Sequence, residues 1–109
     1  MSQDPSSLPV LPAEPPELQA TRERLLAILE TEAPGATGTA QPLLRSLHAL
    51  LVNTRPGEPF NPGLYDDVKA AIARFMKDPV FPPPPVLMEC MTFMQERQAA
   101  FLMATATQR

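Results

Sequence analysis

The chain of 109 residues contains one cysteine, one histidine, one tyrosine and no tryptophan. The single cysteine, Cys90, excludes a disulfide within the chain, and a free thiol among apolar neighbours is typical of a reducing compartment. Cys90 and His48 together are too few for a structural zinc site, which takes four ligands. With so few aromatic residues, we also do not expect a surface on which nucleic-acid bases stack.

The sequence also lacks a charged run of either sign and a long apolar run. Its basic residues are spread along the chain and the formal net charge is −3, which gives no electrostatic reason to bind nucleic acid or an acidic membrane. No segment approaches the ~20 apolar residues of a transmembrane helix. The first residues show neither the basic start nor the apolar run of a signal peptide. We therefore expect a cytoplasmic protein.

No group of residues typical of an active site is found. His48 has no second base at catalytic spacing, so we expect a partly buried, hydrogen-bonded histidine. Cys90 has no CxxC partner and no nearby basic residue to lower its pKa, which predicts an inert buried thiol. Asp66 and Asp67 are neighbours that diverge on a helix, and the start of a helix already favours them. The sequence thus predicts no cofactor, no metal and no enzymatic activity.

Proline, by contrast, is abundant, with fifteen residues grouped in clusters. Residues 1–15 hold prolines at positions 5, 9, 12 and 15 and are expected to form an extended or disordered arm, since proline removes backbone donors and disfavours helix before it. Residues 16–109 are expected to form a single helical domain. Within the arm, the segment PVLPAEPP (residues 9–16) is a candidate docking peptide, although disorder alone also explains it.

Apolar periodicity predicts four helices, at residues 16–31, 41–52, 62–78 and 86–104. The third has the clearest start, because Asn61 suits the N-cap and Pro62 the first helical position. Phe60 is then expected to pack on Tyr65 as a hydrophobic staple. No strand-like alternation persists along the chain. The predicted fold class is therefore all-α, a small antiparallel bundle of four helices with an extended Pro-rich N-terminal arm.

Four consecutive prolines at residues 82–85 precede the last helix. Such a run prefers a polyproline II helix of ~3.1 Å per residue, and we interpret it as a spacer that holds the last two helices at a fixed separation. Its P-x-x-P pattern also fits a docking peptide. The run lies inside the folded region and has no convincing flanking arginine, so the spacer is the preferred interpretation.

The last helix has more apolar surface than one core needs. On a wheel of ~100° per residue its apolar side chains cover about half of the circumference, whereas a core-facing helix needs little more than ~100°. Arg97 and Gln98 interrupt this arc only in its second half. Two interpretations stay open: the other helices cover this helix, or part of it is a docking surface. The flexible thioethers of methionine favour docking, and a self-associated pair would satisfy both.

The first hypothesis is a non-enzymatic interaction protein, such as an accessory subunit, an assembly chaperone or an inhibitor. Its partner is another protein or a second copy of the chain. The residues expected to bind that partner are Leu87, Met88, Met91, Met94 and Phe101.

Two other classes remain as alternatives. One is a small helical DNA-binding regulator, with residues 41–52 and 62–78 as a helix-turn-helix pair. The acidic balance opposes it, and the connector at residues 53–61 is longer than the ~3–4-residue turn of that motif. The other is a small enzyme, which would need a partner chain to supply catalytic groups.

Overall fold

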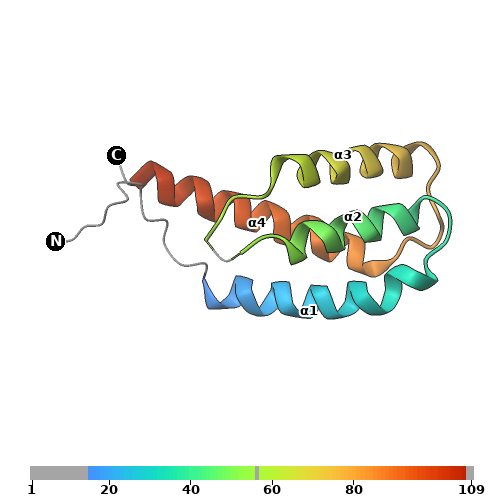
Figure 1. Ribbon diagram of the computed structural model, residues 1–109, viewed down its shortest axis with the longest axis horizontal. Coiled ribbons are helices and arrows are strands. Elements are labelled where there is room, and N and C mark those ends of the chain that lie inside the picture. The colour runs from blue at the N-terminus through green and yellow to red at the C-terminus, as the bar shows by residue number, and fades with distance from the viewer. Residues whose placement is uncertain (1–14, 56, 108–109) are drawn as a thin grey trace.

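The computed structural model describes residues 15–55 and 57–107, apart from the side chains of residues 101 and 104–107. Within these ranges the chain forms no strand, so the predicted all-α class is confirmed (Figure 1). The elements are α1 (Pro16–Glu32), the 3₁₀ turn η1 (Ala33–Gly35), α2 (Ala40–Val52), α3 (Pro62–Lys77) and α4 (Pro85–Thr107). Except for Pro15, the arm predicted at residues 1–15 lies outside the described part.

Three of the four helices begin at a proline: α1 at Pro16, α3 at Pro62 and α4 at Pro85. Proline is favoured at the first helical position because the N–H that it lacks would have no partner within the helix. As a result, α4 begins one residue earlier than the expected Val86 and takes up the last of the four consecutive prolines. The other three, residues 82–84, form part of the connection from α3.

The start of α3 follows the local sequence signals. The backbone N–H of Leu64 donates to Oδ1 of Asn61 over 3.0 Å, which makes Asn61 the N-cap. The rings of Phe60 and Tyr65 stack with their centroids 5.8 Å apart and their planes 12° apart. Both the predicted cap and the predicted contact between the two rings are therefore confirmed.

Replacing Asn61 with alanine should lower the free energy of unfolding by about 1 kcal/mol, because one backbone donor of the first turn loses its acceptor. The matched control is Asn61→Asp, since aspartate caps about as well as asparagine. Urea titration of both variants measures the difference. If aspartate lowers stability as much as alanine does, the cap is not what stabilises this helix start.

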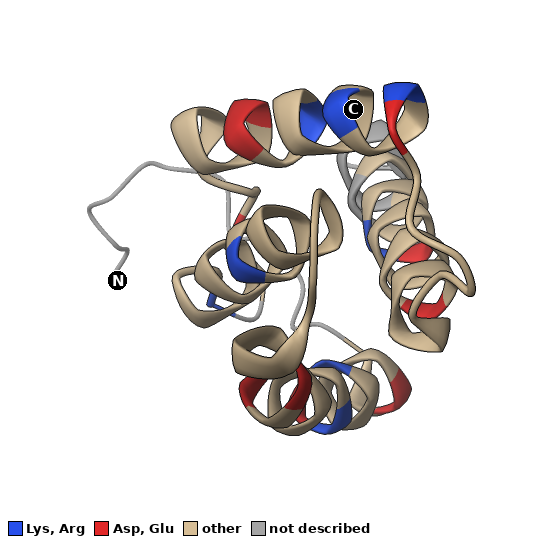
Figure 2. Cartoon of the chain, turned by 90° about the vertical axis from the view of Figure 1, so that its right-hand side faces the viewer, with Lys and Arg blue, Asp and Glu red and all other residues tan. Residues whose placement is uncertain are grey.

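The helices enclose one apolar core. Helix α2 packs on both α1 and α3, and α1 also packs on α4. Viewed along the long axis, α3 is seen from its side above α2, whereas the other helices are seen more nearly end-on (Figure 2). In this core, α1 contributes Leu18, Leu25 and Leu29, and α2 contributes Leu43, Leu44, Leu47, Leu50 and Leu51. Helix α3 contributes Val68 and Ala71, and α4 contributes Val86, Leu87, Cys90, Phe93 and Met94.

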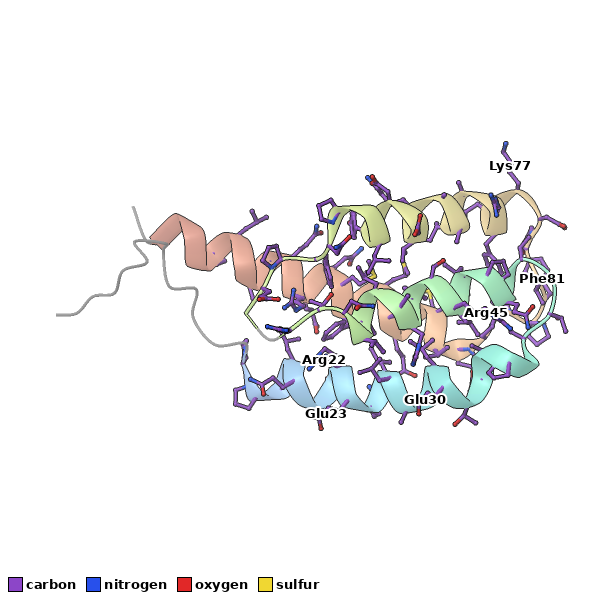
Figure 3. All side chains as sticks on the ribbon, viewed as in Figure 1. Arg22, Glu23, Glu30, Arg45, Lys77 and Phe81 are labelled. Atoms are coloured by element: carbon purple, nitrogen blue, oxygen red, sulfur yellow. The ribbon has the colours of Figure 1, made fainter. Side chains whose placement is uncertain are left out.

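A partly buried polar contact ties α1 to the end of α2. One guanidinium nitrogen of Arg22 donates to the carbonyl oxygens of Leu51 and Thr54, each over 3.1 Å. In the view of Figure 3, Arg22 points from α1 toward α2, whereas Glu23 and Glu30 point away from it. A cation at a helix C-terminus satisfies its last carbonyls and opposes the helix dipole. The first half of α1 is thereby held against the connector between α2 and α3.

None of the helices within residues 15–55 and 57–107 combines the length and the apolar character needed to cross a membrane.

Candidate functional site

Helix α4 has three sides of different chemistry. Its buried residues fall between about 340° and 100° on a wheel that starts at Val86, and this side faces the core. Its two glutamates, Glu89 and Glu96, fall near 280–300°. The described side chains between about 140° and 260° carry no formal charge. The core-facing side anchors the helix, whereas the uncharged side is mostly exposed.

The five residues predicted to bind a partner divide between these sides. Leu87 and Met94 are each only 7% exposed and belong to the core. Met88 is 71% exposed, and Met91 is half-buried at the edge of the core. Phe101 lies in α4, but its side chain is outside the described part. The structure thus leaves Met88 and the outer part of Met91 accessible to a partner and buries Leu87 and Met94 within the chain.

We call the uncharged side of α4 the outer stripe. Apart from half-buried Met91, its members are exposed, and Leu102 and Met103 are 66% and 68% exposed. It extends over ~22 Å from Met88 to Met103, at 1.5 Å per residue. Figure 1 shows the C-terminal end of α4 extending beyond the beginning of α1, so the stripe continues onto a projecting segment. Its residues are Met88, Met91, Thr92, Gln95, Ala99, Leu102 and Met103.

Arg97 departs from what the sequence suggests, since it interrupts the apolar arc and yet points inward. It is 5% exposed. One guanidinium nitrogen donates to the carbonyl oxygen of Arg55 over 2.8 Å, and the guanidinium carbon lies 4.9 Å from the ring centre of Phe60. The cation is tolerated there because a carbonyl dipole and the negative face of an aromatic ring replace part of its hydration.

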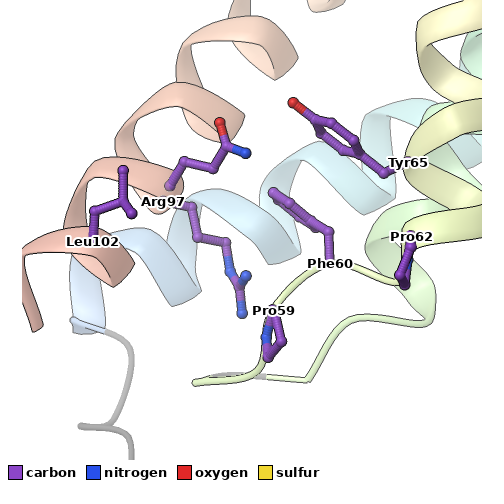
Figure 4. A pocket seen from close by; sticks show the side chains of 7 residues that line it. Pro59, Phe60, Pro62, Tyr65, Arg97 and Leu102 are labelled. Carbon is purple, nitrogen blue, oxygen red and sulfur yellow. The ribbon is translucent and has the colours of Figure 1, made fainter. Parts of the chain in front are cut away.

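Beside Arg97 the surface is hollowed, with a cavity volume of about 330 Å³. Figure 4 shows Phe60 between Arg97 and Tyr65, with Pro59 and Pro62 on the connector side and Leu102 across the hollow. We call this feature the aromatic hollow. Its walls come from the start of α3, the connector before it and the second half of α4, so it forms only when these segments meet.

The two candidate reactive side chains lie apart from both surfaces. Cys90 is fully buried, and this burial, helped by the negative charge of Glu89, raises the pKa of its thiol to about 12. The thiol is therefore protonated at neutral pH, as expected of an inert cysteine. His48 is partly buried as predicted, but its Nε2 has no hydrogen-bond partner among the described residues. The prediction of a hydrogen-bonded histidine is thus wrong for that atom, because Nε2 is buried where no described donor or acceptor reaches it.

In the part of the chain that the structure describes, no three His, Cys, Asp or Glu side chains lie close enough together to hold a metal ion. Comparison of the chain with protein-family models, curated proteins and solved structures finds no match.

Sequence reasoning missed part of the outer stripe and all of the hollow. Leu102 falls on the predicted apolar arc but was not among the predicted binding residues, and Met103 falls outside that arc. The stripe could have been found by marking charged residues, rather than hydropathy, on the helical wheel. One third of the helix surface then carries no charge from Met88 to Met103. The hollow had one local signal, the pair Phe60 and Tyr65, which the staple alone explains.

Proposed function

We propose that the protein is a non-enzymatic interaction protein of the cytoplasm that docks a protein partner through the outer stripe of α4. It would serve as an accessory subunit, an assembly chaperone or an inhibitor. We also propose that its four helices form an antiparallel bundle. The stripe keeps Met88 and Met91 of the predicted binding residues and replaces the buried Leu87 and Met94 with Leu102 and Met103.

One observation supports this proposal above the others: α4 fills the core with one side and exposes apolar residues on another. Met88, Leu102 and Met103 are all about two-thirds exposed or more, although each could contribute ~1.5–3 kcal/mol if buried. Single exposed apolar residues are ordinary, but here several recur along one uncharged helix side. Methionine also adapts its shape to the surface that it meets.

The dimensions of the stripe favour a partner with a groove over a flat contact or a second copy. A side of a helix ~10–12 Å across and ~22 Å long offers a footprint of a few hundred Å². Specific interfaces bury ~800 Å² on each partner, so two stripes laid against each other fall well short. An apolar groove that surrounds the stripe and the projecting end of α4 reaches a larger area. Recognition of a helix in a groove uses the same i, i+3, i+4, i+7 spacing of side chains.

The charges beside the stripe add one requirement to the partner. Glu89 and Glu96 both lie along one edge of the stripe. Glu89 already has a counterion in Arg24 of α1, through an exposed ion pair of 2.5 Å, so the requirement rests on Glu96. Complementary charge at the rim of an interface speeds association and sets orientation. The partner that fits is thus a protein with an apolar groove and a basic rim along one side.

Replacing both Met88 and Met103 with glutamate should weaken capture of the partner by ~100-fold or more. Each carboxylate would enter an apolar groove without a counterion, at a cost above the ~1.4 kcal/mol that corresponds to a tenfold change. The measurement is quantitative affinity capture of the same partner by the full chain and by the variant. Far-UV circular dichroism of the variant should match that of the parent chain.

The matched control is Met76→Glu, because Met76 is 73% exposed on α3 and lies off the stripe. It should leave capture unchanged. Equal loss of capture in the control, or unfolding of the Met88 and Met103 variant, would contradict the proposal, because exposed residues should tolerate glutamate in the isolated chain.

The DNA-binding alternative has no observation in its favour. Figure 2 shows basic residues intermixed with acidic ones on the helices rather than gathered on one face. Salt-sensitive binding of the purified chain to duplex DNA would revive it.

A further inference from the structure

We propose that the aromatic hollow binds the Pro-rich segment of this same chain, residues 9–14. This inference goes beyond the proposed function, because it concerns a surface that shares only Leu102 with the outer stripe and an occupant within the chain. The proposal rests on the chemistry of the hollow, on the proline spacing of the segment and on where the described part of the chain begins.

The lining of the hollow has the chemistry that recognises proline-rich peptides. Grooves that bind polyproline II segments are lined with aromatic rings, against which the proline rings pack. Here Phe60 and Tyr65 stack 5.8 Å apart, and both are half-buried, so the rings are held in place and still reachable. Arg97 fixes the Phe60 ring from α4, and Lys69 lies 5.3 Å from the ring centre of Tyr65. Two cations therefore border the rings.

The spacing of the prolines matches such a surface. A polyproline II helix has three residues per turn, so Pro9 and Pro12 would form one ridge in line with Pro15. Pro15 itself is exposed at the start of α1 and does not line the hollow. Glu14 is the one charged residue of the segment, and its sign is opposite to that of the cations beside the rings. Pro5 falls one residue out of step with this ridge, and it therefore offers a matched control.

The segment joins the described part of the chain at the same end of the molecule as the hollow. Pro15 directly precedes α1, and Arg22, less than two turns into α1, contacts the carbonyl of Thr54 in the connector that leads to the hollow. Figure 1 places the beginning of α1 and the end of α4, which carries Leu102, at the same end of the protein. At ~3.1 Å per residue, residues 9–14 extend up to ~20 Å from Pro15.

Tyr65 gives a direct reporter, because it is the only tyrosine and the chain has no tryptophan. In the full chain, replacing Pro9 and Pro12 with alanine should shift the ring resonances of Tyr65 in NMR spectra and change its fluorescence. Pro5→Ala should leave both unchanged. Spectra of the Pro9 and Pro12 variant that coincide with those of the parent chain would overturn the proposal. So would a Pro5 variant that shifts Tyr65 equally.

A spin label separates docking within one chain from docking between two copies. Ser7→Cys can be labelled with a nitroxide at neutral pH, because Cys90 is buried and its thiol is protonated. Broadening of the Tyr65 ring signals that persists on dilution and disappears on reduction of the nitroxide supports docking within the chain. Broadening seen only when labelled chains are mixed with unlabelled, isotope-enriched chains overturns it in favour of a second copy.

The outcome is independent of the proposed function. The Met88 and Met103 variant should give the same Tyr65 spectrum as the parent chain, because neither residue contributes to the lining of the hollow.

Discussion

Replacing Phe93 with alanine is expected to lower the free energy of unfolding by about 3–5 kcal/mol, a large share of the ~5–15 kcal/mol of a typical domain. Phe93 is 1% exposed and lies midway along the core-facing side of α4. Its removal takes a large apolar group out of the core and leaves a cavity that the four helices can close only in part. The midpoint of urea unfolding measures the loss.

The matched control for this prediction is Phe81→Ala, because Phe81 is 79% exposed in the connection between α3 and α4. It should change stability by no more than ~0.5 kcal/mol, as surface substitutions usually do. If Phe93→Ala does not fold, Phe93→Leu keeps most of the volume and should give a smaller loss that can still be measured. Similar unfolding midpoints for the Phe93 and Phe81 variants would mean that α4 does not build the core.

Replacing Arg97 with alanine is expected to lower the free energy of unfolding by about 2–5 kcal/mol. The change removes a charge-assisted hydrogen bond to the carbonyl of Arg55, worth ~1.5–3 kcal/mol, and a contact with the Phe60 ring worth ~0.5–2 kcal/mol. It also leaves that carbonyl without the donor that now reaches it. Because Arg97 is 5% exposed, water replaces little of what is lost.

Arg24 serves as the control, since its ion pair with Glu89 is on the surface, with side chains 54% and 41% exposed. Solvent screens such pairs, and Arg24→Ala should cost ~0–1 kcal/mol. Arg97→Lys should fall between the two, because lysine keeps the charge but not the planar guanidinium. Equal losses for Arg97→Ala and Arg24→Ala would show that the buried contact does not stabilise the fold.

Local signals in the sequence predict the helices well. The start of α3 depends on residues within one turn of each other, namely Phe60, Asn61, Pro62 and Tyr65. Interactions between residues so close in the sequence can be predicted from the sequence alone. The spacing of the five leucines of α2 likewise gives that helix one apolar side, and all five are in the core.

The orientation of α4 could not be read in the same way. Apolar residues occur on most sides of this helix, so periodicity alone does not decide which side faces inward. Leu87 and Met88 are neighbours of similar hydropathy, yet one is buried and the other exposed. The choice depends on the shape of the surface that α1 and the other helices present, which is a property of the packed chain.

Arg97 and the aromatic hollow show the same limit for polar residues. A lone arginine on a helix is expected in solvent, and its burial needs a carbonyl from Arg55 and a ring from Phe60, about forty residues away in the sequence. The hollow likewise combines the connector before α3 with the second half of α4. No sequence window contains both.

The central claim, that the outer stripe of α4 is a docking surface, is tested most directly by site-specific photo-crosslinking in the cells that produce the protein. A photoreactive residue would replace Gln95, which is exposed at the centre of the stripe, or Met76 on α3 as the control position. The account predicts that the Gln95 position forms a covalent adduct with one partner protein, that the unmodified chain competes for it and that the Met88 and Met103 variant does not. An adduct pattern at Gln95 that is absent, or the same as at Met76, would contradict it.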